Sequence, residues 1–288
     1  MARLTGYGVA AGRSVQSPRA ARRLALPSGA MATAAHRVDR LWPDPGFELE
    51  MDDAFADLSL PEPPADRPLV SINMVTSVDG RAQLNGSAEG LGSRADRRLM
   101  RLLRAGHDAV ASGVGTMRAT GIFLRVPDDL ALRRTMRGRA PQPLGVVIAG
   151  AHQVPTDAKW WSGDERRILF VGRDSPHAAD PGTIPGGTEL LIAPDRVPDP
   201  AWVLQQLHER GVRTLLMEGG PRINAGFLGQ GLIDEVFWTL GAKLLGNDGL
   251  PMIARIPTDS PMGDEPFEGR LVSVHRHGDE LFLHYRFG

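Results

Sequence analysis

The sequence predicts an α/β fold with a mostly parallel central sheet flanked by helices and a C-terminal antiparallel hairpin. Short apolar segments alternate with helix-forming segments between residues 69 and 240, and this alternation is typical of a parallel sheet covered by helices. Two further strand-like segments, 271–275 and 281–287, are joined by a turn at Gly278-Asp279, which predicts a hairpin. We expect this hairpin to add antiparallel strands at the edge of the sheet.

Length and composition limit the classes of protein to which the chain can belong. Its 288 residues suffice for one large α/β domain or two small ones. The formal net charge of -1 argues against sequence-independent nucleic-acid binding, which needs a basic surface. No segment approaches the roughly 18 consecutive apolar residues of a membrane-spanning helix, and the lack of cysteine excludes disulfides and thiolate metal sites. We therefore expect a cytoplasmic protein that binds neither nucleic acid nor membrane.

Two segments precede the region with regular strand and helix patterns. Residues 1–38 contain no Asp or Glu but several Arg, which is typical of a transit peptide. We favour the alternative of a disordered tail, or of a start codon placed upstream of a true start near Met31. Residues 39–67 are acidic and Pro-rich, and we expect an extended lead-in that Trp42 and Phe47 pin to the core. The folded domain is then 68–288.

Within that domain, individual patterns predict individual elements. Residues 69–75 form an apolar strand, and Ser93 followed by Asp96 forms a capping box, with Asp in place of the usual Glu, for a helix to residue 105. Residues 117–142 are basic and weakly patterned, and we expect a mobile loop there. Further strands are expected at 108–112, 144–149, 168–171, 189–192, 213–217 and 236–240, and further helices at 200–210 and from Pro221 to near Gly229.

Clustered glycines follow two of the predicted strands, at the edge of a parallel sheet where ligands bind. In the first cluster, Gly113 and Gly115 precede Thr116, and small residues let backbone N–H groups approach a phosphate. It is not a complete dinucleotide fingerprint, because Arg118 stands in place of the third glycine. A plain tight turn is the alternative interpretation.

The second cluster, Glu218-Gly219-Gly220-Pro221, joins a strongly apolar strand to a helix. The N-terminus of that helix offers N–H donors and the positive end of its dipole to a pyrophosphate. A carboxylate at the end of a buried strand is costly without a partner or a ligand donor, so we expect Glu218 to have one or the other. The alternative is a glycine-rich turn with a solvated glutamate.

Clustered arginines and histidines form two further candidate sites. Arg94, Arg97, Arg101 and Arg104 share one face of the helix after Ser93, and guanidinium groups bind phosphate in a bidentate manner. A solvated basic face explains most of them, and Arg104, nearest the strand ends, is our candidate ligand. The histidines His275, His277 and His284 fit the surface of an edge strand better than a metal site, so we expect no metal.

Five short motifs, taken in order, resemble one known family. They are Ser77–Arg81, Leu102–Ala105, Gly113–Thr116, Glu218–Pro221 and Ala242–Gly246. Together they resemble the reductase domain of the bifunctional riboflavin deaminase-reductases, across about residues 68–287. The resemblance implies a dihydrofolate-reductase-like fold and a homodimer. It also implies NADPH-dependent reduction of a 5-amino-6-(5-phosphoribosylamino)pyrimidine to its ribityl form in riboflavin biosynthesis. Deaminase activity is not expected, because the deaminase half of that family needs a Cys-rich zinc site.

The resemblance also assigns site residues. The family's substrate-contacting Arg and Glu fall on Arg104 and Glu218, its loop Arg on Arg125, and a strand position that is often Lys on Asn73. A family Ser that contacts substrate falls on either Ser87 or Ala88. The cofactor-binding residues that we expect are Val75, Gly113, Gly115, Thr116, Gly150, Gly219, Gly220, Pro221, Arg222, Ile223 and Asn224.

The implied chemistry leaves two questions open. We expect Glu218 to orient the substrate and Asp79 to act as the proton donor, which requires a raised pKa; a structural Asx turn at Asp79 is equally compatible with its position. The alternatives to a pyrimidine reductase are a reductase of the same fold acting on a pterin such as dihydrofolate, and a non-catalytic NADP-binding protein.

Overall fold

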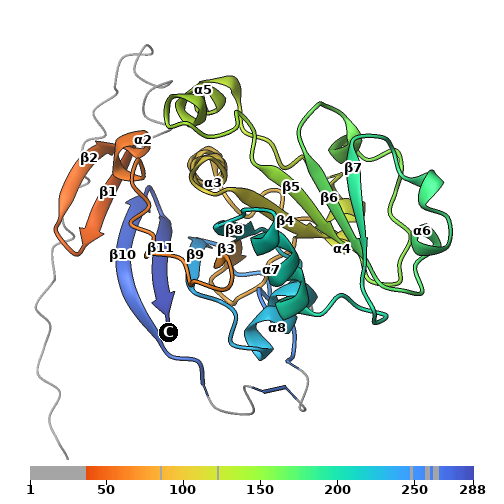
Figure 1. Ribbon diagram of the computed structural model, residues 1–288. Helices are drawn as coiled ribbons and strands as arrows, with labels where there is room; N and C mark the ends of the chain where they lie inside the picture. The colour runs from red at the N-terminus through yellow and green to blue at the C-terminus, as the bar shows by residue number, and fades with distance from the viewer. Residues whose placement is uncertain (1–36, 85, 122, 247–248, 257–259, 262–265) are drawn as a thin grey trace, which may run out of the picture. The chain divides into compact units, whose positions relative to one another are not determined.

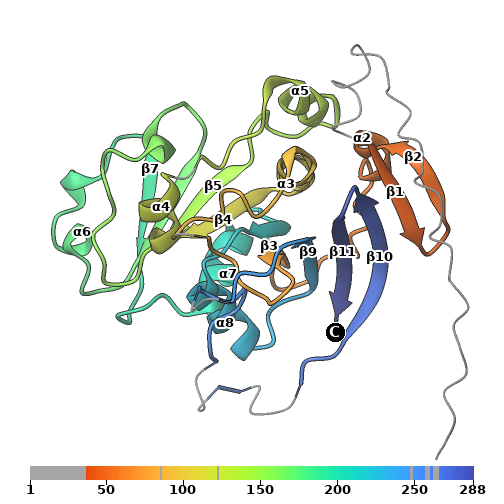
Figure 2. The same cartoon turned by 180° about the vertical axis from the view of Figure 1, so that it is seen from behind.

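The computed structural model describes residues 37–288 except 85, 122, 247–248, 257–259 and 262–265. In these ranges the chain forms an eleven-stranded sheet with helices on both faces (Figures 1 and 2). The strands are β1 (Arg37–Trp42), β2 (Gly46–Glu50), β3 (Leu69–Ser77), β4 (Ala109–Gly113), β5 (Leu144–Ile148), β6 (Arg167–Val171), β7 (Thr188–Ile192), β8 (Thr214–Met217), β9 (Glu235–Gly241), β10 (Gly269–His277) and β11 (Glu280–Phe287). The α-helices are α2 (Met51–Ala54), α3 (Arg94–Gly106), α4 (Val114–Thr120), α5 (Asp128–Met136), α6 (Pro176–Ala179), α7 (Pro200–Glu209) and α8 (Pro221–Gly229), with 3-10 turns at Lys159–Trp161 and Pro181–Thr183.

The strand order confirms the predicted mostly parallel sheet. It runs β2-β1-β10-β11-β9-β3-β8-β4-β5-β6-β7. From β9 to β7 every neighbouring pair is parallel, and from β9 to β2 every pair is antiparallel. The parallel half brings the carboxyl ends of β3, β4 and β8 to one edge of the sheet, which is where ligands bind in such folds.

The predicted hairpin, β10–β11, is present, but the expectation that it forms the edge of the sheet is wrong. Strand β1 pairs with β10, and β2 pairs with β1. These two strands come from the segment predicted as an extended lead-in, and β1 begins two residues before the predicted boundary at 39; the rest of the predicted tail lies outside the described residues. Pairing with β1 gives hydrogen-bond partners to backbone N–H and C=O groups of β10 that would be unpaired at the edge of the sheet.

The expectation that Trp42 and Phe47 anchor this segment to the core is wrong. Their relative exposures are 51% and 67%. The anchoring side chains are instead Val38, Met51 and Phe55, which are buried in the cluster around α3. The two aromatic residues were misleading because exposed apolar side chains are common in folded proteins.

Residues 117–142, predicted to form a mobile loop, contain most of α4 and the whole of α5. Helix α5 packs on α3, with Leu130 buried in the core. Arg134 is buried as well, and its guanidinium donates to the carbonyls of Ala105 (3.0 Å), His107 (2.6 Å) and Ala140 (2.9 Å). The weak apolar pattern hid this helix because one of its inward-facing residues is a charged arginine.

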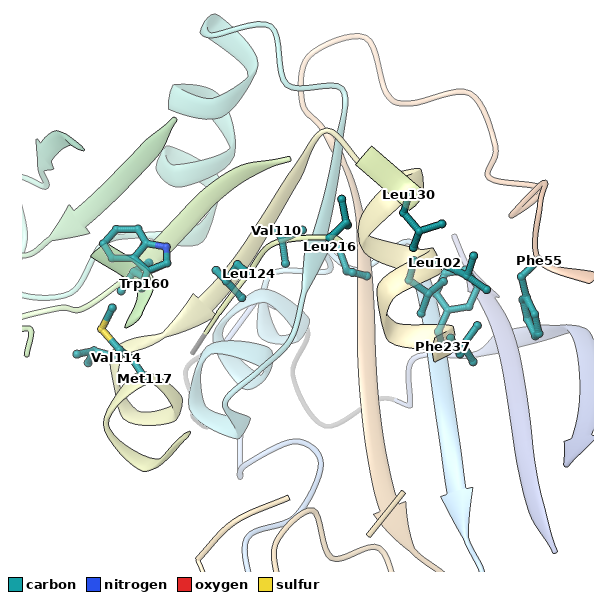
Figure 3. Close-up of a cluster of buried hydrophobic side chains, with 14 of the residues drawn as sticks. Phe55, Leu102, Val110, Val114, Met117, Leu124, Leu130, Trp160, Leu216 and Phe237 are labelled. Atoms are coloured by element: carbon teal, nitrogen blue, oxygen red, sulfur yellow. The ribbon is translucent and has the colours of Figure 1, made fainter. Parts of the chain in front are cut away.

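Two apolar clusters cover the two faces of the sheet. On one face, side chains of α3, α4 and α5 pack on β4, β5 and β8 (Figure 3). On the other face, α7 and α8 pack on the same strands. Because successive strand residues point to opposite faces, Leu215 and Leu216 belong to different clusters. Burial on both faces explains the nearly continuous apolar runs of these strands.

The interpretation of the C-terminal histidines as strand surface is wrong for two of the three. His275 and His284 are buried, because β10 and β11 are interior strands. His284 bonds Glu235 and stacks on Phe237 at 4.1 Å between ring centroids. Burial lowers the pKa of His275 to about 4, and this ring packs on Phe55 at 4.5 Å. Both histidines therefore belong to the interior of the antiparallel half of the sheet.

Replacement of Arg134 tests the junction between α3 and α5. We expect Arg134→Met to lower the free energy of unfolding by about 3 kcal/mol, because it leaves several buried carbonyls without a donor. The neighbouring Arg133 makes a half-exposed ion pair with Asp52, so Arg133→Met is the matched control and loses under about 1 kcal/mol. Chemical denaturation measures both, and equal losses would contradict the role given to Arg134.

Candidate active site at the carboxyl edge of the parallel strands

A cavity of about 280 Å³ opens at the carboxyl ends of β3, β4 and β8. Strand β3 and the loop after it form one wall, α3 forms the second, and the turns after β4 and β8 form the third. The polar and charged residues that line it are Asn73, Gln83, Ser87, Asp96, Arg104, Ser112, Thr116 and Glu218. Its apolar or small residues include Met74, Val75, Ala88, Met100, Phe123, Gly220 and Pro221.

A buried ion pair lies in the wall of the cavity. Arg104, at the end of α3, donates Nε–H to Glu218 Oε1 and Nη2–H to Glu218 Oε2, both at 2.6 Å. This bidentate geometry is the strong form of an arginine–carboxylate pair. The expected partner of Glu218 is thus confirmed, and the partner is Arg104, 114 residues away in the chain.

The remaining N–H groups of Arg104 hold the loop that follows α4. Its Nη1 donates to the carbonyls of Phe123 at 2.6 Å and Arg125 at 3.1 Å, and Nη2 also contacts Met100 Sδ at 3.7 Å. A guanidinium has five N–H donors, and all of them have partners here. The predicted role of Arg104 as a substrate ligand stays a prediction; what the geometry shows is that Arg104 positions Glu218 and the loop.

The two glycine clusters meet beside this pair. Gly113 N donates to Gly219 O at 2.8 Å, and a Cβ at Gly113 would lie 2.7 Å from Ile223 Cδ1. Gly219 has φ +84°, a conformation that side chains other than glycine's rarely permit. The end of β4 therefore packs directly on the first turn of α8, and this close approach and the backbone conformation explain Gly113 and Gly219 without a ligand.

Asp79 lies in the turn after β3. It is not among the described residues that line the cavity. Its carboxylate accepts the backbone N–H groups of Leu245 (3.1 Å) and Gly246 (2.8 Å) and the Ser77 hydroxyl (2.6 Å). These bonds, that of Ser77 foremost, hold the pKa of Asp79 well below its usual value. A proton donor needs the opposite shift, so the geometry supports the structural alternative for Asp79.

The Ala242–Gly246 motif has a structural explanation in the same region. Lys243 Nζ donates to Leu91 O, and Val78 N donates to Lys243 O, both at 2.8 Å. With the Asp79 contacts, these bonds tie the segment after β9 to both ends of loop 78–91. That loop supplies Gln83, Ser87 and Ala88 to the cavity, so both residues that compete for the family's serine position line it.

Other predicted site residues lie outside the cavity lining among the described residues. Arg125 approaches Glu165, with 3.4 Å between Nε and Oε2, and lies over the ring of Phe123. Gly150 follows β5 and accepts the N–H of Gly172 at 2.8 Å. Asn224 is buried in α8 and donates to Met252 O at 3.1 Å, while Arg222 is exposed. Of the predicted cofactor residues, Val75, Thr116, Gly220 and Pro221 line the cavity.

The sequence interpretation missed Asp96 as a cavity residue. It assigned Asp96 to a capping box, and the Ser93 hydroxyl does accept the N–H groups of Ala95 (3.0 Å) and Asp96 (3.4 Å). The Asp96 side chain, however, lines the cavity. Its spacing from Arg104 and Met100, eight and four residues on one helix, puts all three on one face, and that spacing was available in the sequence.

Known proteins identify first the class of fold and then the family to which the chain belongs. A pyrimidine reductase-like protein from Corynebacterium diphtheriae has the same fold, with a TM-score of 0.67, 20% identity, and coverage of 77% of this chain and 93% of that one. Residues 68–281 match the RibD C-terminal domain. The chain belongs to that family.

Two relatives illustrate the range of the family. The 2,5-diamino-6-ribosylamino-4(3H)-pyrimidinone 5′-phosphate reductase of Archaeoglobus fulgidus is 31% identical over 194 residues, which cover 65% of this chain and 86% of that protein. The riboflavin biosynthesis protein RibD of Aquifex aeolicus is 25% identical over 77% of this chain, which spans 58% of that longer protein.

No helix in the described part of the chain is long and apolar enough to cross a membrane.

A double-mutant cycle tests the Arg104–Glu218 pair. We expect Arg104→Met to lower the free energy of unfolding by about 3 to 5 kcal/mol, because a buried carboxylate loses its partner. Adding Glu218→Met to that variant removes the unpaired charge, and the double variant should be more stable than Arg104→Met alone. Additive losses in urea denaturation would show that the two side chains do not interact in solution.

Proposed function

We propose that this chain is an NADPH-dependent oxidoreductase of riboflavin biosynthesis. Its substrate is a 5-amino-6-(5-phosphoribosylamino)pyrimidine, whose ribosyl group it reduces to ribityl; the fold is the dihydrofolate-reductase-like type, and the active form is a homodimer. The observation that carries the proposal is the Arg104–Glu218 pair, which holds a carboxylate in the wall of the cavity beside the glycine turn. The name of the Archaeoglobus relative supports the choice of substrate.

The residues at the glycine turn fit a nicotinamide dinucleotide. A Cβ at Gly115 would meet no atom within 4 Å, so a ligand can approach the backbone there. Helix α8 begins at Pro221 beside the cavity, and the positive end of its dipole favours the negative charge of a pyrophosphate. Gly113, Gly115, Thr116 and the segment from Gly219 to Asn224 would hold the cofactor, with Val75 and Gly150 at its margins. When bound, a reduced nicotinamide supplies a hydride.

The polar lining fits the heterocycle and its open-chain sugar. Glu218 has both oxygens turned to Arg104 but keeps acceptor capacity, since a carboxylate has about four lone-pair sites. We assign it to a pyrimidine N–H or ribose hydroxyl, and Asn73 to an exocyclic group of the ring. Met100 and Phe123, both in contact with Arg104, present apolar surface to the cavity. These side chains would orient the substrate, and orientation supplies several kcal/mol of the lowering of the barrier.

Helix α3 offers guanidinium groups to the 5′-phosphate of the substrate. Arg104, our first candidate, has all its donors engaged, so a phosphate contact requires it to release a carbonyl. Arg97 lies seven residues earlier, on the same helix face, and is exposed. We assign the main phosphate contact to Arg97, with Arg104 completing the site and Arg125 outside it.

The first assay follows NADPH oxidation at 340 nm with the diamino and the deaminated ribosylamino-pyrimidine 5′-phosphates offered separately. We expect turnover of at least one, and a loss of about 100-fold in kcat/KM when the phosphate is removed, since charge-assisted hydrogen bonds contribute about 3 kcal/mol. Turnover of dihydrofolate with neither pyrimidine reduced would overturn the proposal in favour of a pterin reductase. NADPH binding without any turnover would favour a non-catalytic binder.

Replacement of Arg97 tests the phosphate assignment. Arg97→Gln should raise KM for the phosphorylated substrate by about 10-fold or more, with little change for the dephosphorylated one. Arg137 is also exposed but lies at the end of α5, away from the residues that line the cavity, so Arg137→Gln is the matched control with an unchanged KM. Equal KM values for Arg97→Gln and the wild type would return the phosphate site to Arg104.

A further inference from the structure

The cavity holds a second acidic side chain besides Glu218, and nothing in its surroundings explains it as a structural group. Asp96 lies in the first turn of α3 and lines the same cavity as Asn73 and Glu218. The cap of α3 is made by the Ser93 hydroxyl, which accepts the N–H groups of Ala95 and Asp96. Among the described residues, no arginine, lysine or histidine forms an ion pair with it.

The position of the carboxyl is set by tight packing. A Cβ added at Gly92 would collide with Oδ2, Cγ and Cβ of Asp96, so the side chain lies directly over the Gly92 backbone. Two residues of the neighbouring strands, Thr239 on β9 and Glu280 on β11, lie close enough to act on this carboxyl. Glu280 is itself buried, and its Oε2 has no hydrogen-bond partner in the part of the chain that is described.

These neighbours favour the protonated form of the Asp96 carboxyl. Burial raises its pKa to about 6, the nearby charges of Glu280 and Glu218 add to the rise, and the Thr239 hydroxyl and the Arg97 guanidinium oppose it. Burial and like charges both disfavour an ionised carboxyl. The other two acids of the region have partners that favour the charged carboxylate. Asp79 accepts backbone N–H groups and a hydroxyl, and Glu218 is paired with Arg104.

We propose that Asp96 is the acid that protonates the substrate nitrogen during reduction. The inference rests on the proposed function and adds the proton donor that this reaction needs. In the ring-opened imine form of the substrate, C1′ is double-bonded to the nitrogen that joins the sugar to the pyrimidine. C1′ accepts a hydride from a reduced nicotinamide, and the electron pair of the C=N π bond moves onto the nitrogen. The nitrogen takes the proton of Asp96, and the resulting carboxylate regains a proton from water after product release.

The proposal predicts a specific dependence of kcat on pH. The acid is active only when protonated, so kcat is constant below a midpoint near pH 6 and falls about tenfold per pH unit above it. Asp96→Asn has the same size and retains the packing over Gly92, but it carries no acidic proton. We expect it to lower kcat by about 100-fold or more and to abolish the descending limb. Asp128, exposed in the first turn of α5, provides the matched control Asp128→Asn, which should keep the wild-type profile.

Two further variants move the midpoint in opposite directions. The Thr239 hydroxyl lowers the pKa of Asp96, so Thr239→Val should shift the midpoint of the kcat profile to higher pH. The Glu280 charge raises that pKa, so Glu280→Gln should shift the midpoint to lower pH. A merely structural role for Asp96 would change the height of the profile in these variants without moving its midpoint.

A titration without substrate gives a second readout of the same group. In the apoprotein, infrared difference spectra should show a protonated carboxyl band that is lost between pH 5 and 7 and is missing in Asp96→Asn. Loss of the band, a lowered kcat in Asp96→Asn and the opposite midpoint shifts would together support the proposal. A wild-type profile in Asp96→Asn would overturn it and leave the reductase standing. Absence of pyrimidine turnover by the wild-type chain would overturn the proposed function and this inference with it.

Discussion

The bidentate contact between Arg104 and Glu218 is the interaction on which the organisation of the site depends. It joins the end of α3 to the end of β8, and through Nη1 it also fixes the loop after α4. A carboxylate at the end of a buried strand would be destabilising on its own. Paired with a guanidinium, it becomes a fixed acceptor in the cavity wall, which is the property that orientation of a polar substrate requires.

The acids around the cavity are distinguished by their immediate surroundings. Asp79 accepts two backbone N–H groups and a hydroxyl, and it holds the segment after β9 against the cavity loop. Glu218 is held by a guanidinium. Asp96 has no backbone N–H or bidentate guanidinium partner among the described residues, and burial and the nearby Glu280 and Glu218 outweigh the effects of the Thr239 hydroxyl and Arg97. One set of carboxyl groups therefore supplies a structural clamp, a fixed acceptor and a proton donor, because hydrogen bonds, charge and burial act differently on each.

Local patterns predicted the parallel half of the fold well, and contacts between distant segments decided the rest. Strands such as β8 are buried on both faces, so their apolar runs are visible in the sequence. The pairing of β1 with β10 is not visible there, because it joins residues more than 200 positions apart and its exposed aromatic residues point outward. Helix α5 was missed because its buried Arg134 resembles a surface residue until its carbonyl partners are known. In the site, the need of Glu218 for a partner could be predicted, but the commitment of Arg104 to that role could not.

The most direct test is a crystal structure of the protein with NADP⁺ and the ribitylamino-pyrimidine 5′-phosphate product bound together. We expect the pyrimidine to lie between Glu218 and Asn73, with the phosphate at Arg97 and the nitrogen next to C1′ facing Asp96. The nicotinamide should lie in the cavity next to Thr116 and Gly220, which line it side by side. A product bound elsewhere, or bound in this cavity with its C1′ nitrogen turned away from Asp96 and its ring away from Glu218, would contradict the mechanism derived from the structure.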